Sequence, residues 1–177
     1  MPNRQGTGSY YDVCFAIGHL CLKWEHLETR LYFLFAALFD GDIISDIDVY
    51  KNSTSFQARK AAVEQAAATA LRQEPELLDR VRKMLKRINS LSKRRNQVIH
   101  GQLEDAHFQN SKLTRSGGYI AASIYLVGFA TFDSYHYSVK DIIGFANAFE
   151  TCRHDLNSLS DEVAYRLGRI GVGETWG

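Results

Sequence analysis

The residues with the clearest chemical potential lie in the stretch KRRNQVIHGQ, residues 93–102. Arg95 is always charged, and its planar guanidinium matches the geometry of a phosphate group. Histidine side chains in general change their charge near neutral pH, so His100 is a candidate to accept or donate a proton. Together with Asn96, these two side chains suit chemistry on a phosphodiester, and no metal ion is required if a ribose 2′-hydroxyl is the attacking group.

The same residues also have a purely structural interpretation. Gly101 suits the position just after a helix, and a histidine in the last helical turn interacts favourably with the helix dipole. Arg95 would then pair with a carboxylate on another helix, for which Glu25 and Glu28 are candidates. Which interpretation holds depends on the helices that carry these side chains and on what lies beside them.

The bulk composition is that of an ordinary globular protein. The chain has 177 residues, so a single domain with a sizeable core is expected. The formal net charge is only +1, so any nucleic-acid-binding surface must be local. An odd number of cysteines favours reduced thiols, and the chain has no signal peptide and no apolar run long enough for a membrane span. We therefore expect a cytoplasmic protein that does not contact a membrane.

Apolar periodicity predicts four helices, at about residues 9–39, 55–73, 76–100 and 138–168. The chain contains only two prolines, which permits long helices. The stripe of the third helix continues through Ile88 and Leu91 and then falls on Arg95, where the pattern calls for an apolar residue. The other predicted stripe positions are Val13, Ile17, Leu20, Trp24, Leu27, Leu31, Leu34 and Leu38; Leu77, Val81 and Met84 or Leu85; and Ile142, Phe145, Phe149, Cys152, Leu156, Leu159, Val163 and Leu167.

Residues 102–137 differ in character from the rest of the chain. They are rich in β-branched and aromatic residues separated by turn residues, which predicts an antiparallel hairpin or a three-stranded insertion. The sequence thus predicts a mostly α fold, an up-and-down four-helix bundle with a small antiparallel β insertion between the third and fourth main helices. We find no repeat or linker, so residues 1–177 are expected to form one domain with flexible ends at about 1–8 and 169–177.

The stretch RNQVIHG resembles the signature of the HEPN superfamily (higher eukaryotes and prokaryotes nucleotide-binding). That signature is an arginine followed by four to six residues and a histidine, often with a polar residue such as asparagine after the arginine. The family fold is a four-helix bundle with the motif near the end of the third main helix, as expected here. The resemblance is detailed over Lys93 to Gly101 and architectural over most of Ser9 to Gly168.

Many HEPN proteins are metal-independent RNA endonucleases in which the motifs of two subunits form one composite site. The resemblance implies catalytic roles for His100 as general acid/base, Arg95 as the ligand of the scissile phosphate, and Asn96 as the residue that orients His100 or the phosphate. Lys93 and Arg94 would bind RNA. The products would be a 2′,3′-cyclic phosphate and a 5′-hydroxyl, and neither a metal nor a cofactor is implied.

The geometry of a helix agrees with a composite site. At about 100° per residue, the side chains of Arg95 and His100 point about 140° apart. One copy alone is therefore a poor site, whereas two motifs facing each other across a symmetry axis would bring the groups together. Arg94 also fits the family spacing, but Arg95 is preferred because asparagine follows it. The implied partners are a second copy, single-stranded RNA and, for a toxin or defence effector, an antitoxin protein.

Two other functions stay open. The chain could be a non-catalytic HEPN module that binds RNA, a nucleotide or a protein, or a structural helical protein without a ligand. The basic residues from Arg80 to Arg87 could follow an RNA backbone, but a solvated helix face is the favoured interpretation. Three further sets have weaker functional interpretations: His19, Glu25, His26 and Glu28 as metal ligands; Cys152 and His154; and Tyr125, Tyr135, His136 and Tyr137 as stacking platforms.

Overall fold

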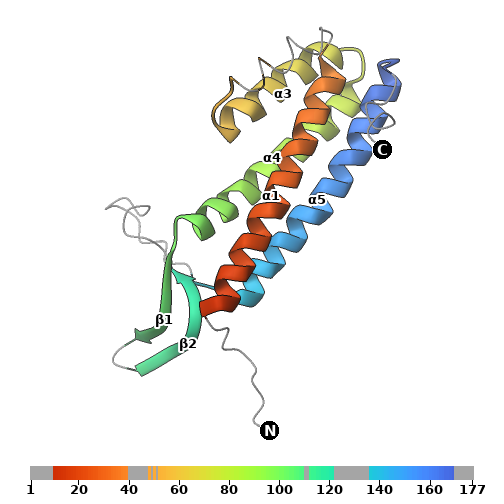
Figure 1. Ribbon diagram of the computed structural model, residues 1–177. Coiled ribbons are helices and arrows are strands. Elements are labelled where there is room, and N and C mark those ends of the chain that lie inside the picture. Colours follow the sequence, from red (N-terminus) through yellow and green to blue (C-terminus); the bar gives the residue numbers. More distant parts are fainter. Residues whose placement is uncertain are drawn as a thin grey trace. The chain divides into compact units, whose positions relative to one another are not determined.

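The computed structural model describes residues 10–39, 48, 50, 52–109, 112–121 and 136–169, and all structural statements concern these residues. The described residues form four helices and three strands, and Figure 1 labels the helices and the two longer strands. The elements are α1 (Tyr10–Leu38), α3 (Phe56–Ala70), α4 (Pro75–Ile99), β1 (Gln102–Gln109), β2 (Lys112–Ala121), β3 (His136–Ser138) and α5 (Val139–Arg166). The predicted fold class, mostly α with four helices and a small antiparallel β insertion before the last one, is confirmed.

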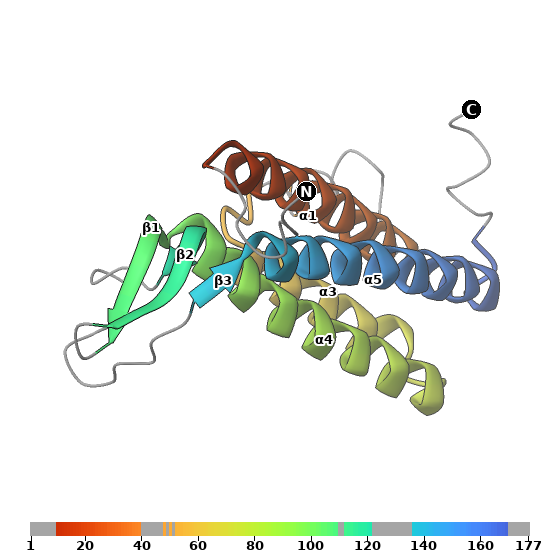
Figure 2. The same cartoon turned by 90° about the horizontal axis from the view of Figure 1, so that it is seen from below.

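The β insertion is a three-stranded antiparallel sheet in the order β1-β2-β3. Figure 2 shows the strands between the end of α4 and the start of α5. Ile120 in β2 pairs with Leu103 in β1 and with Tyr137 in β3. Both Ile120 and Tyr137 are buried, so the middle of this sheet contributes to the core. The rest of the predicted insertion, residues 110–111 and 122–135, lies outside the described residues.

The chain divides into two units. The first consists of Met1–Trp24 and Lys93–Phe149, and the second of Glu25–Ser92 and Glu150–Gly177. The first unit thus contains the β insertion and the last turns of α4, which carry the arginine-histidine motif. Because α1, α4 and α5 each begin in one unit and end in the other, the two units share three uninterrupted helices.

Ion pairs define the helix directions within the second unit. Arg80 bonds Glu162 at 2.7 Å and Arg87 bonds Asp155 at 2.5 Å, so α4 and α5 run antiparallel there. Arg169 donates from Nη1 to the Ala37 and Phe39 carbonyl oxygens, which places the ends of α1 and α5 together. α4 begins near the end at which both α1 and α5 finish. The helices therefore do not alternate strictly in direction.

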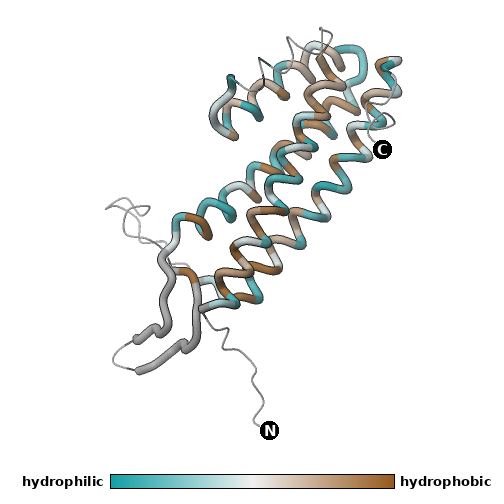
Figure 3. Tube along the Cα trace, in the orientation of Figure 1, coloured by the Kyte–Doolittle hydropathy of each residue, from teal (hydrophilic) through white to brown (hydrophobic). Residues whose placement is uncertain are grey.

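The predicted apolar stripes form the helix cores with few exceptions. Figure 3 shows the alternation of apolar and polar residues along the helices. On α1, every predicted position is buried apart from Ile17, which is half-buried, and small Ala16 is fully buried beside it. On α4, Leu85 rather than Met84 occupies the stripe, and Ser92 is buried with its hydroxyl donating to the Asn89 carbonyl oxygen.

Side-chain hydrogen bonds cap the starts of α3 and α5. Ser55 accepts the Ala58 backbone N–H through its side chain and is the N-cap of α3. At α5, the Ser138 hydroxyl accepts from the Asp141 N–H at 3.3 Å, and the Asp141 carboxylate accepts from the Ser138 N–H at 2.8 Å. This reciprocal pair satisfies donors that a helix leaves unpaired, so Ser138 caps the start of α5.

Among the described residues, we find no helix with both the length and the apolar character that crossing a bilayer requires.

Cys152 is expected to resist alkylation in the folded protein. It is fully buried on α5, its Sγ lies 3.7 Å from the Met84 Sδ, and burial raises its pKa to about 11. At pH 8 only about one such thiol in a thousand would be the reactive thiolate. Mass spectrometry after iodoacetamide treatment should find exposed Cys14 modified and Cys152 modified only in urea. Rapid labelling of Cys152 without denaturant would contradict this burial.

Candidate functional site

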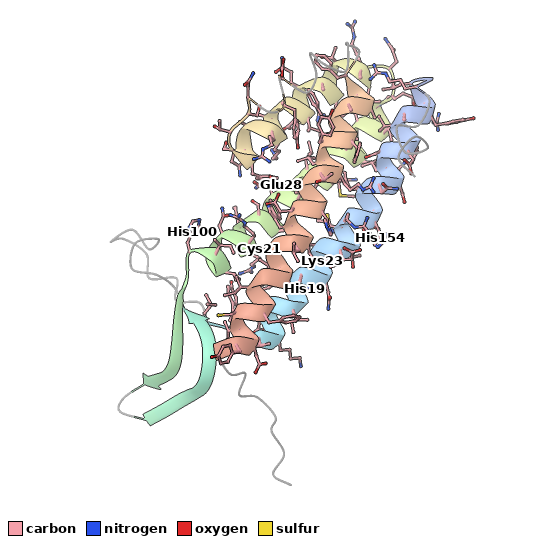
Figure 4. The ribbon with its side chains drawn as sticks, viewed as in Figure 1. His19, Cys21, Lys23, Glu28, His100 and His154 are labelled. Atoms are coloured by element: carbon pink, nitrogen blue, oxygen red, sulfur yellow. The ribbon has the colours of Figure 1, made fainter. Side chains whose placement is uncertain are left out.

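The candidate site occupies the last two turns of α4, in the first unit. Lys93, Arg94, Asn96 and His100 are exposed, whereas Arg95 is half-buried. The helix ends at Ile99, and the His100 backbone N–H still donates to the Asn96 carbonyl oxygen at 3.0 Å. Figure 4 shows His100 at this end of α4, where the chain passes into β1. The predicted end of the third helix is thus accurate to one residue.

Arg95 and His100 of one chain differ in their surroundings, as the helical geometry predicts. Arg95 lies towards the side of α4 that carries buried Val98, whereas His100 is exposed to solvent. The Nε of Arg95 is buried and has no hydrogen-bond partner among the described residues. A buried guanidinium nitrogen without a partner is unusual, because removing such a donor from water costs free energy.

The side chain of Asn96 contacts Arg95. Its Oδ1 accepts a hydrogen bond from Arg95 Nη1 at 3.2 Å. This bond restricts the rotation of the guanidinium. The observed contact therefore orients Arg95, a role that the resemblance did not imply for Asn96.

Arg94 has a structural role that the sequence interpretation did not anticipate. Its Nη1 donates to the Tyr137 hydroxyl at 2.6 Å and to Gln97 Oε1 at 3.3 Å, and its guanidinium lies 6.0 Å from the Phe145 ring centre. The Tyr137 hydroxyl in turn donates to Gln97 Oε1 at 2.8 Å. Arg94 thus fixes the end of α4 to β3 and α5, and this engagement agrees with the preference for Arg95 as the motif arginine.

The Tyr137→Phe variant is expected to lose about 1–3 kcal/mol of unfolding free energy. Tyr137 is 8% exposed, and removing its hydroxyl leaves Arg94 and Gln97 each without one hydrogen bond. Urea denaturation would measure the change. The control Tyr165→Phe alters a tyrosine that is 83% exposed and should change stability by less than about 0.5 kcal/mol. Equal stability of the two variants would contradict a structural role for the Tyr137 hydroxyl.

The sequence offered one local signal for this network. Tyr137 directly precedes the N-cap Ser138, and an apolar residue at that position often packs against the helix that follows. The ring of Tyr137 indeed meets Phe145 edge-on, with ring centres 4.9 Å apart. Tyr137 therefore packs against α5, while Tyr125 and Tyr135 lie outside the described residues.

Three of the basic residues earlier on α4 are paired with carboxylates. Arg80 and Arg87 bond acidic residues of α5, and Lys83 bonds Asp79 one turn earlier at 2.6 Å. The hydrogen bond that Arg80 donates to Glu162 raises the pKa of Arg80, and the one that Arg87 donates to Asp155 raises the pKa of Arg87. These contacts support the interpretation of this part of α4 as a helix face with local ion pairs.

Two of the side chains considered as partners of Arg95 or as metal ligands make contacts of a different kind. Glu28, a candidate partner of Arg95, instead accepts a hydrogen bond from Arg59 at 3.0 Å. The ring of His19 stacks parallel to Phe15, with ring centres 6.4 Å apart. Within the described part of the chain, no three or more His, Cys, Asp or Glu side chains gather as metal ligands would.

Comparisons of the chain with protein-family models, with curated proteins and with solved structures give no significant match in any of the three. The resemblance of RNQVIHG to the HEPN signature therefore stands on those residues and their position on α4 alone.

Proposed function

We propose that this protein is a metal-independent RNA endonuclease of the HEPN type, whose site is completed by a second copy of the chain. The observation that carries this proposal is the state of Arg95. Its guanidinium is half-buried, is held on one side by Asn96, and has a buried Nε without a partner among the described residues. An anion beside this guanidinium would offset the unsatisfied donor, and a phosphate is the anion that its planar fork fits best.

The chemistry assigns one task to each side chain. His100 accepts the proton of a ribose 2′-hydroxyl, whose oxygen attacks the adjacent phosphorus. The bond from phosphorus to the 5′-oxygen breaks, and a protonated His100 returns a proton to that leaving oxygen. Arg95 stabilises the extra negative charge that the phosphorane oxygens acquire in the transition state. The products are a 2′,3′-cyclic phosphate and a 5′-hydroxyl, and no metal ion enters the balance.

The need for two copies follows from the positions of Arg95 and His100 on one helix. One side chain is half-buried and the other is exposed, and their directions diverge by about 140°. A phosphate bound by Arg95 of one chain would meet His100 of a second chain if the two motifs face each other. Lys93 is exposed beside the motif and adds positive charge for the RNA backbone.

Incubation of the purified protein with a labelled single-stranded RNA in EDTA tests the proposal. We expect cleavage products that end in a cyclic phosphate. An RNA with 2′-deoxyribose at the cleaved position is the matched control and should stay intact, since it lacks the attacking hydroxyl. Cleavage that requires a divalent cation, or that occurs at the deoxy position, would contradict the mechanism.

The same assay distinguishes the second candidate, a non-catalytic HEPN module. RNA binding without cleavage, weakened when Lys93 is neutralised, would favour this alternative. A role as toxin or defence effector, with an antitoxin protein as partner, predicts growth arrest on expression that depends on His100.

A further inference from the structure

One face of α1 in the first unit carries large apolar side chains in solvent. Tyr11, Phe15 and Leu22 are 81%, 75% and 61% exposed. Gly18 lies on the same face, and a Cβ built there would have no described atom within 4 Å. The opposite face of the same turns forms the core through Val13, Ala16, Leu20 and Trp24. Within the described part of the chain, the first half of α1 is therefore apolar on two sides, of which one is buried and the other exposed.

The spacing of this exposed stripe is symmetric. The steps between Tyr11, Phe15, Gly18 and Leu22 are four, three and four residues, so the stripe has the same spacing in both chain directions. A second α1 placed antiparallel on this face would bring each Tyr11 to Leu22 of the second copy. It would also bring each Phe15 to Gly18 of the second copy, where the missing side chain leaves room for a ring. The ring of Phe15 thus meets the space at Gly18, and the ring of Tyr11 meets the aliphatic side chain of Leu22.

The flanks of the stripe are also complementary to themselves. In an antiparallel helix pair, each flank of one helix faces the same flank of its partner. One flank carries Asp12 and His19, seven residues apart, so each carboxylate would approach an imidazole of the second copy. The other flank carries Cys14 and Cys21 with the same separation, so each Cys14 would approach Cys21 of the second copy. A neutral or attractive pair therefore forms on both sides.

We propose that this stripe is an interface that binds a second copy of the same chain through an antiparallel α1–α1 contact. The four aromatic side chains of such a pair would bury roughly 600–1,000 Å², which approaches the area of a specific interface before the leucines and flanks are counted. A symmetric surface selects an identical partner, because the same patch must serve both sides. The proposal does not rest on the nuclease activity, since none of these residues belongs to the motif on α4.

Sedimentation velocity over a range of protein concentrations tests this interface. The protein should dimerise, and Phe15→Glu should weaken the dimer about 100-fold or more, because each carboxylate would face an apolar surface. Tyr165→Glu, which alters an exposed aromatic residue on α5, is the matched control and should leave the dimer intact. Thermal unfolding should show that the Phe15 variant is still folded. A protein that remains monomeric, or a dimer that Phe15→Glu does not weaken, would refute the proposal.

Oxidative cross-linking tests the antiparallel register. Copper phenanthroline catalyses disulfide formation with dissolved oxygen as the electron acceptor, and Figure 4 labels Cys21 on α1. Seven residues of helix separate Cys14 from Cys21 by about 10 Å, too far for a disulfide within one chain. A covalent dimer with a Cys14–Cys21 peptide pair, lost in Cys14→Ser, supports the proposed register. A Cys14–Cys14 pair in its place, or no covalent dimer, overturns it.

Discussion

Replacing His100 with alanine is expected to lower the rate of RNA cleavage by about two to four orders of magnitude, the usual contribution of a general acid or base. His100 is exposed, and its one described hydrogen bond is made by the backbone. The variant should therefore unfold at the same urea concentration as the unaltered protein. His26→Ala, which alters another exposed histidine, is the control and should keep full activity.

Arg95 variants separate the positive charge from the shape of the guanidinium. Arg95→Lys keeps the charge but loses the fork that contacts Asn96 and a phosphate together. Cleavage should fall strongly in both Arg95→Lys and Arg95→Ala. Undiminished cleavage in the alanine variants at positions 95 and 100 would refute the assignment of the site.

Mixing the two inactive variants tests whether one site uses two chains. If Arg95 of one copy acts with His100 of another, heterodimers of Arg95→Ala and His100→Ala contain one intact pair. Part of the cleavage activity should then return after the variants are mixed and allowed to exchange subunits. Activity that stays absent in a mixture shown to form heterodimers would mean that the site does not combine these groups from two chains.

The helices could be predicted well from the sequence, because a helix with one buried face carries apolar residues at a regular spacing. The steps of four and three residues identify α1, α4 and α5, and their ends agree with the structure within two residues. The prediction for α3 is weaker, since its alanines give little apolar contrast. That helix ends at Ala70 rather than near Gln73, and Leu71 is turned into the core.

The contacts of the site between residues far apart in the chain could not be predicted from the sequence. The role of Arg94 depends on Tyr137, which is 43 residues away and is positioned by β3. No local pattern indicates that a motif residue is engaged by a strand. The exposed stripe of α1 was missed for a different reason. A search for one buried face assigns Phe15 and Leu22 to the surface, although their spacing repeats the helical period on the opposite side.

Replacing Phe149 with alanine should destabilise the protein by about 3–5 kcal/mol, the range for a large aromatic side chain lost from a core. Phe149 is fully buried in the first unit, and its ring meets Trp24 at an interplanar angle of 66° with ring centres 5.4 Å apart. Urea denaturation would give the change in unfolding free energy. Ile143→Ala, on the same helix but 38% exposed, should cost distinctly less and serves as the control.

A double-mutant cycle with Trp24→Ala would isolate the contact between the two rings. An edge-to-face pair contributes about 0.5–1.5 kcal/mol beyond the area that it buries, so the losses of the single variants should not add. Because Trp24 and Phe149 are the last residues of the first unit on α1 and α5, the variants also test the helices that continue into the second unit. An uninterrupted helix transmits the loss of packing along its length, so we expect one unfolding transition at a lower urea concentration. Two separate transitions in the Phe149 variant would show instead that each unit keeps its own stability.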